Sequence, residues 1–237
     1  MKSICIIGQG NVGTHLCVAF AGKVEELFSI DSRTLEDLPE DADLYLLSVS
    51  DSAIEEVAAR MPDVKGVVAH TSGSISIDAL KSVKGPKGVF YPLMTFSKEA
   101  DIDYRQIPVF IEASEDEALL TLRKAAELFS DKVKQMDSRQ RKLMHIASVF
   151  ACNFPNALWN VAYSILKDAH VPFSYMLPLI DASVEKLHHF TPEEAQTGPA
   201  RRGDSKIVDD HMDELSSEPD LQKIYRDLSD LIVKQTS

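Results

Sequence analysis

The sequence ICIIGQGNVG, residues 4–13, decides the fold of this chain. A short apolar run at residues 4–7 is followed at once by glycine, any residue, glycine, two further residues and glycine. Apolar residues with helical spacing then begin at Val12 and continue to Phe20. A strand, a glycine-rich turn and a helix in this order are typical of the βαβ unit that binds a dinucleotide.

Each glycine of this motif has its own physical role. Gly8 allows a tight turn, Gly10 lets the backbone approach a pyrophosphate, and Gly13 lets the helix pack closely on the strand. The free N–H groups of the first helical turn then face the phosphates, where the helix dipole favours negative charge. An ordinary glycine-rich turn without a ligand is the weaker alternative in this context. The predicted phosphate-binding residues are Gly8, Gln9, Gly10, Asn11, Val12 and Gly13.

The end of the second predicted strand, residues 27–30, decides which nicotinamide cofactor is expected. An acidic residue there binds the ribose 2′-hydroxyl of NAD, whereas an arginine accommodates the 2′-phosphate of NADP, and this chain has both Asp31 and Arg33. Side chains alternate along a strand, so Asp31 need not face the ribose. Ser32, Arg33 and Thr34 would all donate to a phosphate. We therefore expect NADP, with a solvated Arg33 as the alternative.

Further apolar segments alternate with helical ones as far as residue 137. Strands are predicted at residues 44–50, 66–70, 89–97, 108–113 and 132–136. This alternation predicts an α/β fold with a Rossmann-type, doubly wound and mostly parallel sheet. Val49 and Ser50 stand at the carboxyl end of a strand, where cofactors bind, and are predicted to contact the cofactor. His70 ends the next strand, and it is either a substrate-binding residue near the nicotinamide or a hydrogen-bonded structural histidine.

The periodicity changes at Ser138, a good helix N-cap, after which only helical spacing is found. We therefore predict two domains, a dinucleotide-binding domain at 1–137 and an all-α domain at 138–237. The first helix of the second domain extends to about residue 168 and should kink at Pro155. Further helices are predicted at 172–188, 205–216 and 219–235.

A line of polar residues follows one side of this long helix, among aromatic neighbours. Transfer of a hydride to a carbonyl or imine needs a proton donor and polar groups that orient the reacting atom. We predict His145 as the proton donor, Asn153 as a second catalytic residue and Asn156 as a substrate-binding residue. The equally weighted alternative is that His145 is structural and that the asparagines cap the break at Pro155. The line consists of Lys142, His145, Cys152, Asn153, Asn156 and Asn160.

Arg201 lies in a second unusual cluster, the sequence RRGD at residues 201–204. An arginine there would bind a substrate carboxylate or phosphate through two hydrogen bonds. Ion pairs that fix the loop or link subunits are the alternatives. No group of histidine, cysteine and carboxylate residues has metal-ligand spacing, so no metal is expected.

Composition excludes several other classes of protein. The 237 residues carry a formal charge of −12, which argues against general nucleic-acid binding and against an anionic membrane surface. No apolar run approaches the roughly 20 residues needed to span a bilayer. Three cysteines without metal spacing suit a reducing compartment, and the N-terminal residues do not suggest a signal peptide. We therefore expect a cytoplasmic protein.

Five segments together resemble a family of uncharacterised NADP oxidoreductases. Members of that family have a Rossmann-like N-terminal domain and a helical C-terminal domain of unknown function. The resemblance covers nearly the whole chain and implies NADP binding and a homodimer joined through the helical domains. The segments are residues 8–13, 32–34, 70–74 (HTSGS), 91–97 (YPLMTFS) and 197–199 with the following Arg201.

More distantly, the arrangement is similar to pyrroline-5-carboxylate reductase and to the 6-phosphogluconate and β-hydroxyacid dehydrogenases. In the β-hydroxyacid enzymes a catalytic lysine precedes an asparagine by one helical turn. Lys142 is followed at that spacing by Ile146, so that mechanism is not transferred to this chain.

The sequence thus predicts an NADP-dependent oxidoreductase that acts on a small polar, anionic carbonyl or imine compound. The alternative is a non-catalytic regulatory protein that binds NADP(H) and reports its level to a partner. The fold alone does not separate these two functions.

Overall fold

A computed structural model describes residues 1–236 of the chain. The contacts divide the chain into two compact units, Met1–Pro155 and Asn156–Ser237. The predicted change from alternating strands and helices to helices alone coincides with the start of α4 at Ser138. The division into compact units falls later, after Pro155, and the domain boundary at 137/138 stays a prediction based on periodicity.

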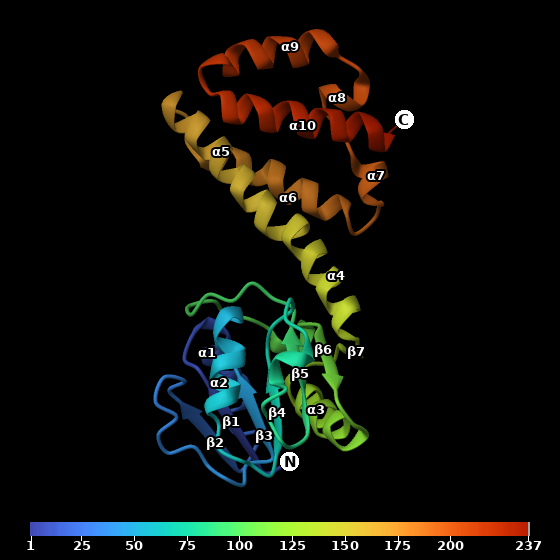
Figure 1. Cartoon of the computed structure of the whole chain (residues 1–237). Helices are drawn as coiled ribbons and strands as arrows, with labels where there is room; N and C mark the ends of the chain where they lie inside the picture. The colour runs from blue at the N-terminus through green and yellow to red at the C-terminus, as the bar shows by residue number, and fades with distance from the viewer. Residues whose placement is uncertain (237) are drawn as a thin grey trace. The chain divides into compact units, whose positions relative to one another are not determined.

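The first unit contains a seven-stranded sheet in the order β2-β1-β3-β4-β5-β6-β7. Every neighbouring pair is parallel except β5 and β6, which are antiparallel. The prediction of a mostly parallel, Rossmann-type sheet is therefore confirmed (Figure 1). The strands are β1 (Ser3–Ile7), β2 (Glu26–Ile30), β3 (Leu44–Leu47), β4 (Val67–His70), β5 (Lys87–Pro92), β6 (Val109–Ala113) and β7 (Val133–Gln135).

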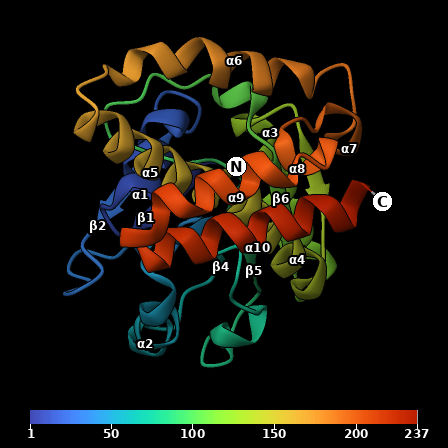
Figure 2. The same cartoon turned by 90° about the horizontal axis from the view of Figure 1, so that it is seen from above.

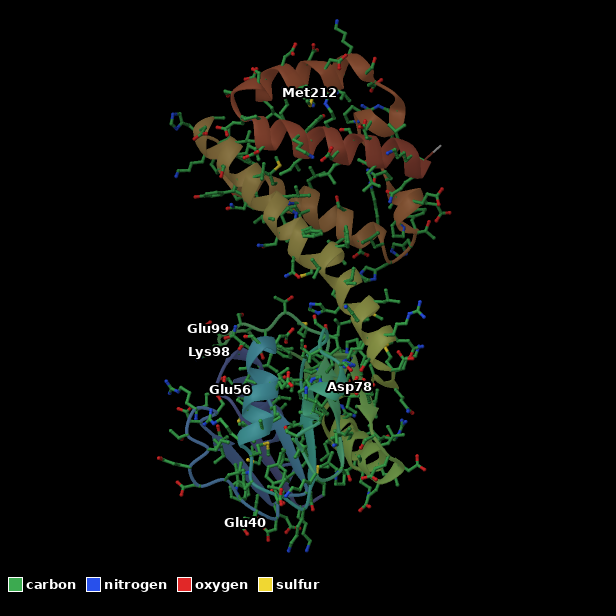
Figure 3. All side chains as sticks on the ribbon, viewed as in Figure 1. Glu40, Glu56, Asp78, Lys98, Glu99 and Met212 are labelled. Carbon is green, nitrogen blue, oxygen red and sulfur yellow. The ribbon has the colours of Figure 1, made fainter. Side chains whose placement is uncertain are left out.

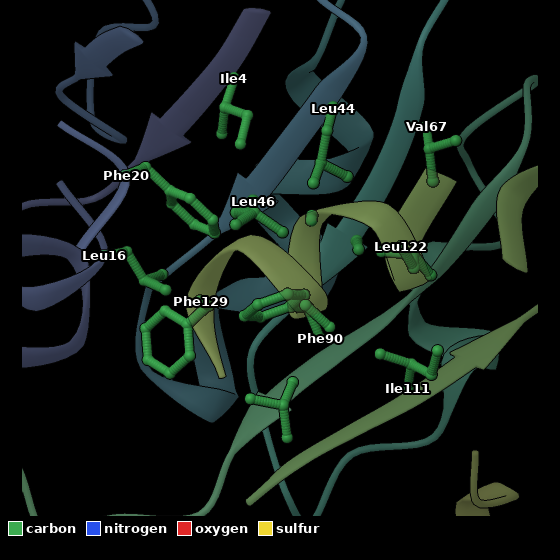
Figure 4. Packing of buried hydrophobic residues seen from close by; sticks show 14 of the residues in the cluster. Ile4, Leu16, Phe20, Leu44, Leu46, Val67, Phe90, Ile111, Leu122 and Phe129 are labelled. Atoms are coloured by element: carbon green, nitrogen blue, oxygen red, sulfur yellow. The ribbon is translucent and has the colours of Figure 1, made fainter. Parts of the chain in front are cut away.

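Helices cover both faces of this sheet. α1 (Asn11–Phe20) and α3 (Asp116–Phe129) pack on one face, where Phe20, Phe90 and Phe129 lie together with their ring centroids 6.0–6.1 Å apart (Figure 4). α2 (Ile54–Arg60) covers the other face, together with the 3₁₀ turn η2 (Ile77–Leu80). Both faces are buried, which is why the central strands are almost continuously apolar.

The strand predicted at residues 89–97 is shorter than expected. β5 ends at Pro92, whose ring nitrogen has no proton to donate to a ladder. The chain then leaves the sheet as a loop, residues 93–103, before the 3₁₀ turn η3 (Tyr104–Gln106). Lys98 and Glu99 lie on this loop (Figure 3).

The long predicted helix is present and contains a local irregularity. α4 (Ser138–Ser148) continues through a π-helical turn, η4 (Val149–Asn153), into α5 (Phe154–Asp168). Pro155 lacks the N–H of a regular helical turn, and the π turn just before it accommodates that loss. The N-cap is Asp137 and not Ser138, because the Asp137 carboxylate accepts from the backbone N–H of Gln140 at 2.7 Å.

The second unit has helices joined by turns and no strand among its described residues, 156–236. Beside α5 it contains α6 (Leu177–Lys186), α7 (Pro192–Ala195), α8 (Pro199–Arg202), α9 (Ser205–Glu214) and α10 (Pro219–Thr236). α9 and α10 run side by side (Figures 1 and 2), and the Met212 side chain lies between them (Figure 3). Short 3₁₀ turns occur at η1 (Asp51–Ala53), η5 (Phe173–Met176) and η6 (Leu215–Ser217).

Candidate functional site

The glycine turn between β1 and α1 has the geometry of a phosphate-binding site. Gly8 has φ of 110°, a conformation that side chains disfavour, and a Cβ atom there would collide with the backbone of Ser48. A Cβ atom at Gly13 would collide with the carbonyl of Gly8. Gly10 instead faces open space, so a ligand can approach its backbone. The local geometry agrees with the tight turn predicted at Gly8 and the close packing predicted at Gly13, while the contact of Gly10 with a pyrophosphate stays a prediction.

The start of α1 is free to receive an anion. Gly10 is the N-cap, no side chain caps the helix, and its first turn has no acidic residue. The first backbone N–H groups of this ten-residue helix therefore lack side-chain acceptors, and the helix dipole is not offset locally. The Asn11 side chain is engaged elsewhere, donating to the carbonyl of Phe96 at 3.0 Å, which leaves its backbone N–H as its means of contact with a phosphate.

Ser48, at the carboxyl end of β3, supplies a second sign that the turn holds a ligand. Its hydroxyl oxygen is buried and has no hydrogen-bonding partner among the described residues. It lies 3.3 Å from the position that a Cβ atom of Gly13 would occupy. Buried hydroxyls normally have a partner, and a water molecule shared with a bound phosphate would provide one. The residues of this turn thus fit a dinucleotide.

At the end of β2 the predicted Arg33 is held by Asp31. The Arg33 guanidinium donates to the Asp31 carboxylate at 3.0 and 2.6 Å, and the backbone N–H of Arg33 donates to it at 2.9 Å. These hydrogen bonds lower the pKa of Asp31 to about 2. The Arg33 side chain is 85% exposed, so it can turn toward a ligand. Thr34 and Asp31 line an open groove of about 550 Å³ beside β2.

Arg60, at the end of α2, is a cation that sequence reasoning missed. Its guanidinium donates to the backbone carbonyl of Arg33 and forms an ion pair with Glu56 at 3.6 Å. Two arginines therefore converge where the adenosine ribose of a dinucleotide is expected. Arg60 lies 27 residues after Arg33 on a different element, and the sequence carried no signal that would connect the two.

The loop at residues 93–103 is tied to α1 beside the glycine turn. His15 is buried and both of its ring nitrogens are engaged, Nδ1 with the Tyr104 hydroxyl and Nε2 with the Ser97 carbonyl, each at 2.7 Å. The bond from Asn11 to Phe96 is a further connection. The loop thus lies against the helix whose N-terminus is the predicted phosphate site.

His70 has the environment of the structural alternative. It is fully buried, its Nδ1 accepts from the Ser72 backbone N–H at 3.2 Å, and its Nε2 donates to the Ser76 carbonyl at 3.3 Å. Burial, and next the positive charge of Arg141, lower the pKa of His70 to about 4, so it is neutral. Both nitrogens have partners within the protein, which favours the structural alternative, and the role of His70 in substrate binding stays a prediction.

A buried arginine that sequence reasoning missed holds the loop after β4. Arg141 is 1% exposed, forms an ion pair with Glu112 at 2.7 Å and donates to the Ser72 carbonyl at 3.1 Å and to the Ile75 carbonyl. Burial lowers the pKa of Arg141, while Glu112 acts in the opposite direction. Because α4 appeared to be part of a separate helical domain, its link to this loop was not anticipated.

His145, the predicted proton donor, lies against the sheet and is partly exposed. Its Nδ1 is 3.2 Å from the hydroxyl of Tyr91, near the end of β5. Gly73, in the loop that Arg141 holds, lies directly over both side chains. The carboxyl ends of β4 and β5 thus meet at His145, at the sheet edge where ligands bind in open α/β sheets.

The remaining predicted residues are not all brought together. Cys152 lies in η4, directly after the helix that carries His145. Its sulfur is 3.3 Å from the Thr95 hydroxyl. The side chain of Asn153 is exposed and has no hydrogen bond within the described residues. The π turn also shifts the phase of the helix, so that the predicted polar line is interrupted there. The catalytic role of Asn153 therefore stays a prediction.

Asn156 and Arg201 belong to the second compact unit. Asn156 is exposed on α5, and the Arg201 guanidinium donates to the Glu193 carbonyl at 3.1 Å. Arg202, its neighbour, pairs with Asp204 at 2.9 Å, as the structural alternative for this cluster proposed. Their roles in substrate binding stay predictions.

Comparison with known proteins places the chain in a family. The family described as a domain of unknown function, DUF2520, matches residues 107–232. The chain belongs to this family. A crystal structure described as a “putative NADP oxidoreductase” from Bacteroides fragilis is 36% identical, covers 98% of both chains and superposes with a TM-score of 0.87. This family membership confirms the resemblance seen in the sequence.

More distant structures share the fold of this DUF2520 protein. A Thermotoga maritima protein is 21% identical over 98% of both chains, with a TM-score of 0.76. A reductive aminase from Aspergillus terreus, solved in complex with NADPH, is 11% identical over 90% of this chain and 78% of its own, with a TM-score of 0.61. A comparison with curated proteins gave no significant match.

No group of three or more histidine, cysteine, aspartate or glutamate residues within residues 1–236 could hold a metal ion. None of the helices in that range is both long and apolar enough to cross a membrane.

Proposed function

We propose that this protein is an NADP-dependent oxidoreductase acting on a small polar, anionic carbonyl or imine compound. The observation that carries the proposal is the open N-terminus of α1 at the glycine turn, with Arg33 and Arg60 at the end of the neighbouring strand. The 36% identical relative described as an NADP oxidoreductase supports the same cofactor.

We propose the following roles for residues of this chain in binding the dinucleotide. The backbone of residues 8–13 binds the pyrophosphate, and Ser32, Arg33 and Thr34 bind the 2′-phosphate. Val49 and Ser50 flank the dinucleotide at the end of β3. Bound NADPH would supply the hydride.

His145 would hold the proton that the reaction requires, because it lies at the carboxyl edge of the sheet with one ring nitrogen already engaged. Asn153 and Asn156 are the proposed groups that orient the substrate, and Arg201 is the proposed partner of its anionic group.

We propose that the protein is a homodimer, in which a second copy of the chain covers the exposed apolar side chains of the second unit. Among its described residues only Met212 is buried, although its helices carry many large apolar side chains. A helical unit of this size needs an apolar core, and exposed apolar patches of this extent mark an interface. Exposed examples include Trp159, Tyr163, Leu179, Phe190 and Leu231.

The cytoplasm is the proposed compartment. Cys5, Cys17 and Cys152 are all free thiols, as a reducing environment would maintain them.

The proposed cofactor is tested by fluorescence titration of the purified protein with NADPH and, separately, with NADH. We expect tighter binding of NADPH and a selective loss of that preference in Arg33→Ala. Arg105→Ala is the matched control, because Arg105 is a surface arginine in η3 that pairs with Asp131 in the turn between α3 and β7. Binding of neither nucleotide would overturn the proposal. Tight binding without oxidation of NADPH across a broad metabolite panel would instead favour a regulatory protein.

A further inference from the structure

The first unit contains two tyrosine–histidine pairs with different surroundings. His15 is buried, and Tyr104 and the Ser97 carbonyl occupy both of its ring nitrogens. His145 is partly exposed, and Tyr91 engages only its Nδ1. Among the described residues, Nε2 of His145 has no hydrogen-bonding partner. The first pair is therefore a closed structural contact, whereas the second leaves one nitrogen available.

The Tyr91 hydroxyl is held rigidly in its place. Tyr91 is 9% exposed and packs with Val89, Phe110 and Met136 in an apolar cluster, against which Met144 of α4 also packs. Burial raises the pKa of Tyr91, so the phenol keeps its proton and remains a hydrogen-bond donor. The hydroxyl oxygen lies 3.2 Å from Nδ1 of His145, and the Ser148 side chain is a second hydrogen-bonding partner of the same hydroxyl.

Gly73 limits where these two side chains can go. A Cβ atom at this position would lie 2.5 Å from Cζ and 2.8 Å from the hydroxyl oxygen of Tyr91, and 2.9 Å from Nδ1 of His145. Only glycine lets the loop close over the pair. Because Arg141 holds this loop through the carbonyls of Ser72 and Ile75, the cover over the pair is fixed as well.

A neutral imidazole carries one proton, and a ring nitrogen that accepts a hydrogen bond leaves that proton on the other nitrogen. We propose that Tyr91 is a positioning residue that fixes His145 as the Nε2–H tautomer, so that Nε2 is the atom that donates to the substrate. This inference rests on the proposed oxidoreductase function for its chemical meaning.

The proton balance of the reduction then follows from the pair. As the carbonyl or imine accepts the hydride, the Nε2–H bond breaks and the O–H or N–H bond of the product forms. The Tyr91 proton moves to Nδ1 in the same step, which keeps the imidazole neutral. A proton from solvent then binds Nε2 while Nδ1 returns its proton to the Tyr91 oxygen, so the Nε2–H tautomer is restored.

The tautomer can be measured without a substrate or a cofactor, by NMR of the full-length protein labelled with ¹⁵N-histidine. The His145 signals are assigned by their loss in His145→Gln. We expect wild-type His145 to show a protonated Nε2 and an unprotonated Nδ1. In Tyr91→Phe the ratio of the two tautomers should change by about fivefold toward Nδ1–H, as expected for loss of one hydrogen bond.

Tyr104→Phe is the matched control, because it removes the equivalent hydroxyl from His15 and should leave the His145 signals unchanged. A protonated Nδ1 in the wild type, or an unchanged tautomer ratio in Tyr91→Phe, would overturn the proposal. Failure of the oxidoreductase proposal would appear separately, as absence of nucleotide binding in a protein whose His145 tautomer is as expected.

A second variant tests the same contact with the phenol retained. Gly73→Ala places a methyl group against Tyr91 and His145 and should shift the tautomer ratio in the same direction as Tyr91→Phe. Gly85→Ala is its control, because the nearest atom to a Cβ there is the Val64 carbonyl oxygen at an ordinary 3.6 Å. An unchanged His145 spectrum in Gly73→Ala would contradict the role given to this loop.

Discussion

Arg141 and Glu112 form a buried ion pair, with Nη1 of Arg141 2.7 Å from Oε2 of Glu112 and the two side chains 1% and 15% exposed. The pair connects the first helix after β7 to the sheet, and Arg141 also binds the loop that covers His145. The Arg141 guanidinium therefore links helix α4 to strand β6 and to the loop after β4.

Removal of the negative partner should destabilise the protein strongly. Glu112→Gln leaves the Arg141 charge buried without compensation, and we expect the free energy of unfolding to fall by about 3 kcal/mol. Urea unfolding followed by circular dichroism measures the change. Asp131→Asn is the control, since it breaks an ion pair with the exposed Arg105 and should cost less than about 1 kcal/mol. Equal effects of both substitutions would contradict the structural role of Arg141.

Asp31 should limit the affinity for NADPH. Its carboxylate holds the Arg33 guanidinium through three hydrogen bonds and would repel a 2′-phosphate bound nearby. In Asp31→Asn the guanidinium is released and the repulsion is removed, so NADPH should bind about fivefold more tightly, while NADH should bind no better. Fluorescence titration with the two nucleotides measures both affinities. Asp37→Asn, farther along the same groove, is the control, and an unchanged NADPH affinity in Asp31→Asn would remove Asp31 from cofactor selection.

The sequence was sufficient to predict the sheet and the glycine turn, because these depend on local patterns. Residues 4–7 are apolar enough to be buried on both faces, and the spacing of Gly8, Gly10 and Gly13 requires a specific turn. The strand predicted at residues 89–97 was too long, because it ends at Pro92, which has no N–H group to donate to the ladder.

The parts of the site that depend on long-range contacts were not predictable. Arg60 reaches Arg33 across 27 residues, and Arg141 reaches Ser72 across 69. Tyr91 was identified only as part of a strand and of the segment that resembles the family, because no periodicity shows that its hydroxyl would meet a histidine 54 residues away. The choice between a structural and a ligand-binding His70 also required the position of Ser76, which only the fold provides.

His70 should make the stability of the protein fall in mild acid. Its pKa is lowered to about 4 in the folded protein from an ordinary 6.5, so below pH 6.5 the unfolded chain binds a proton that the folded chain does not. The free energy of unfolding should therefore decrease as the pH falls from 6.5 to 4, by about 3 kcal/mol in total. Urea unfolding at several pH values should show a smaller decrease in His70→Gln. His189→Gln, on an exposed histidine, should leave the slope unchanged, and a wild-type slope in His70→Gln would contradict the assignment.

The second unit should depend on self-association. Leu179 of α6 is 63% exposed although the unit has little buried apolar surface of its own, so a second copy of the chain is the proposed cover. Light scattering should give the wild type twice the chain mass of 26.3 kDa. Leu179→Asp should weaken the association by roughly tenfold or more, because it places a charge in an apolar interface. Glu185→Gln, on the same helix, is the control and should leave the mass unchanged. A monomeric wild type would show that the apolar faces of these helices are covered in another way.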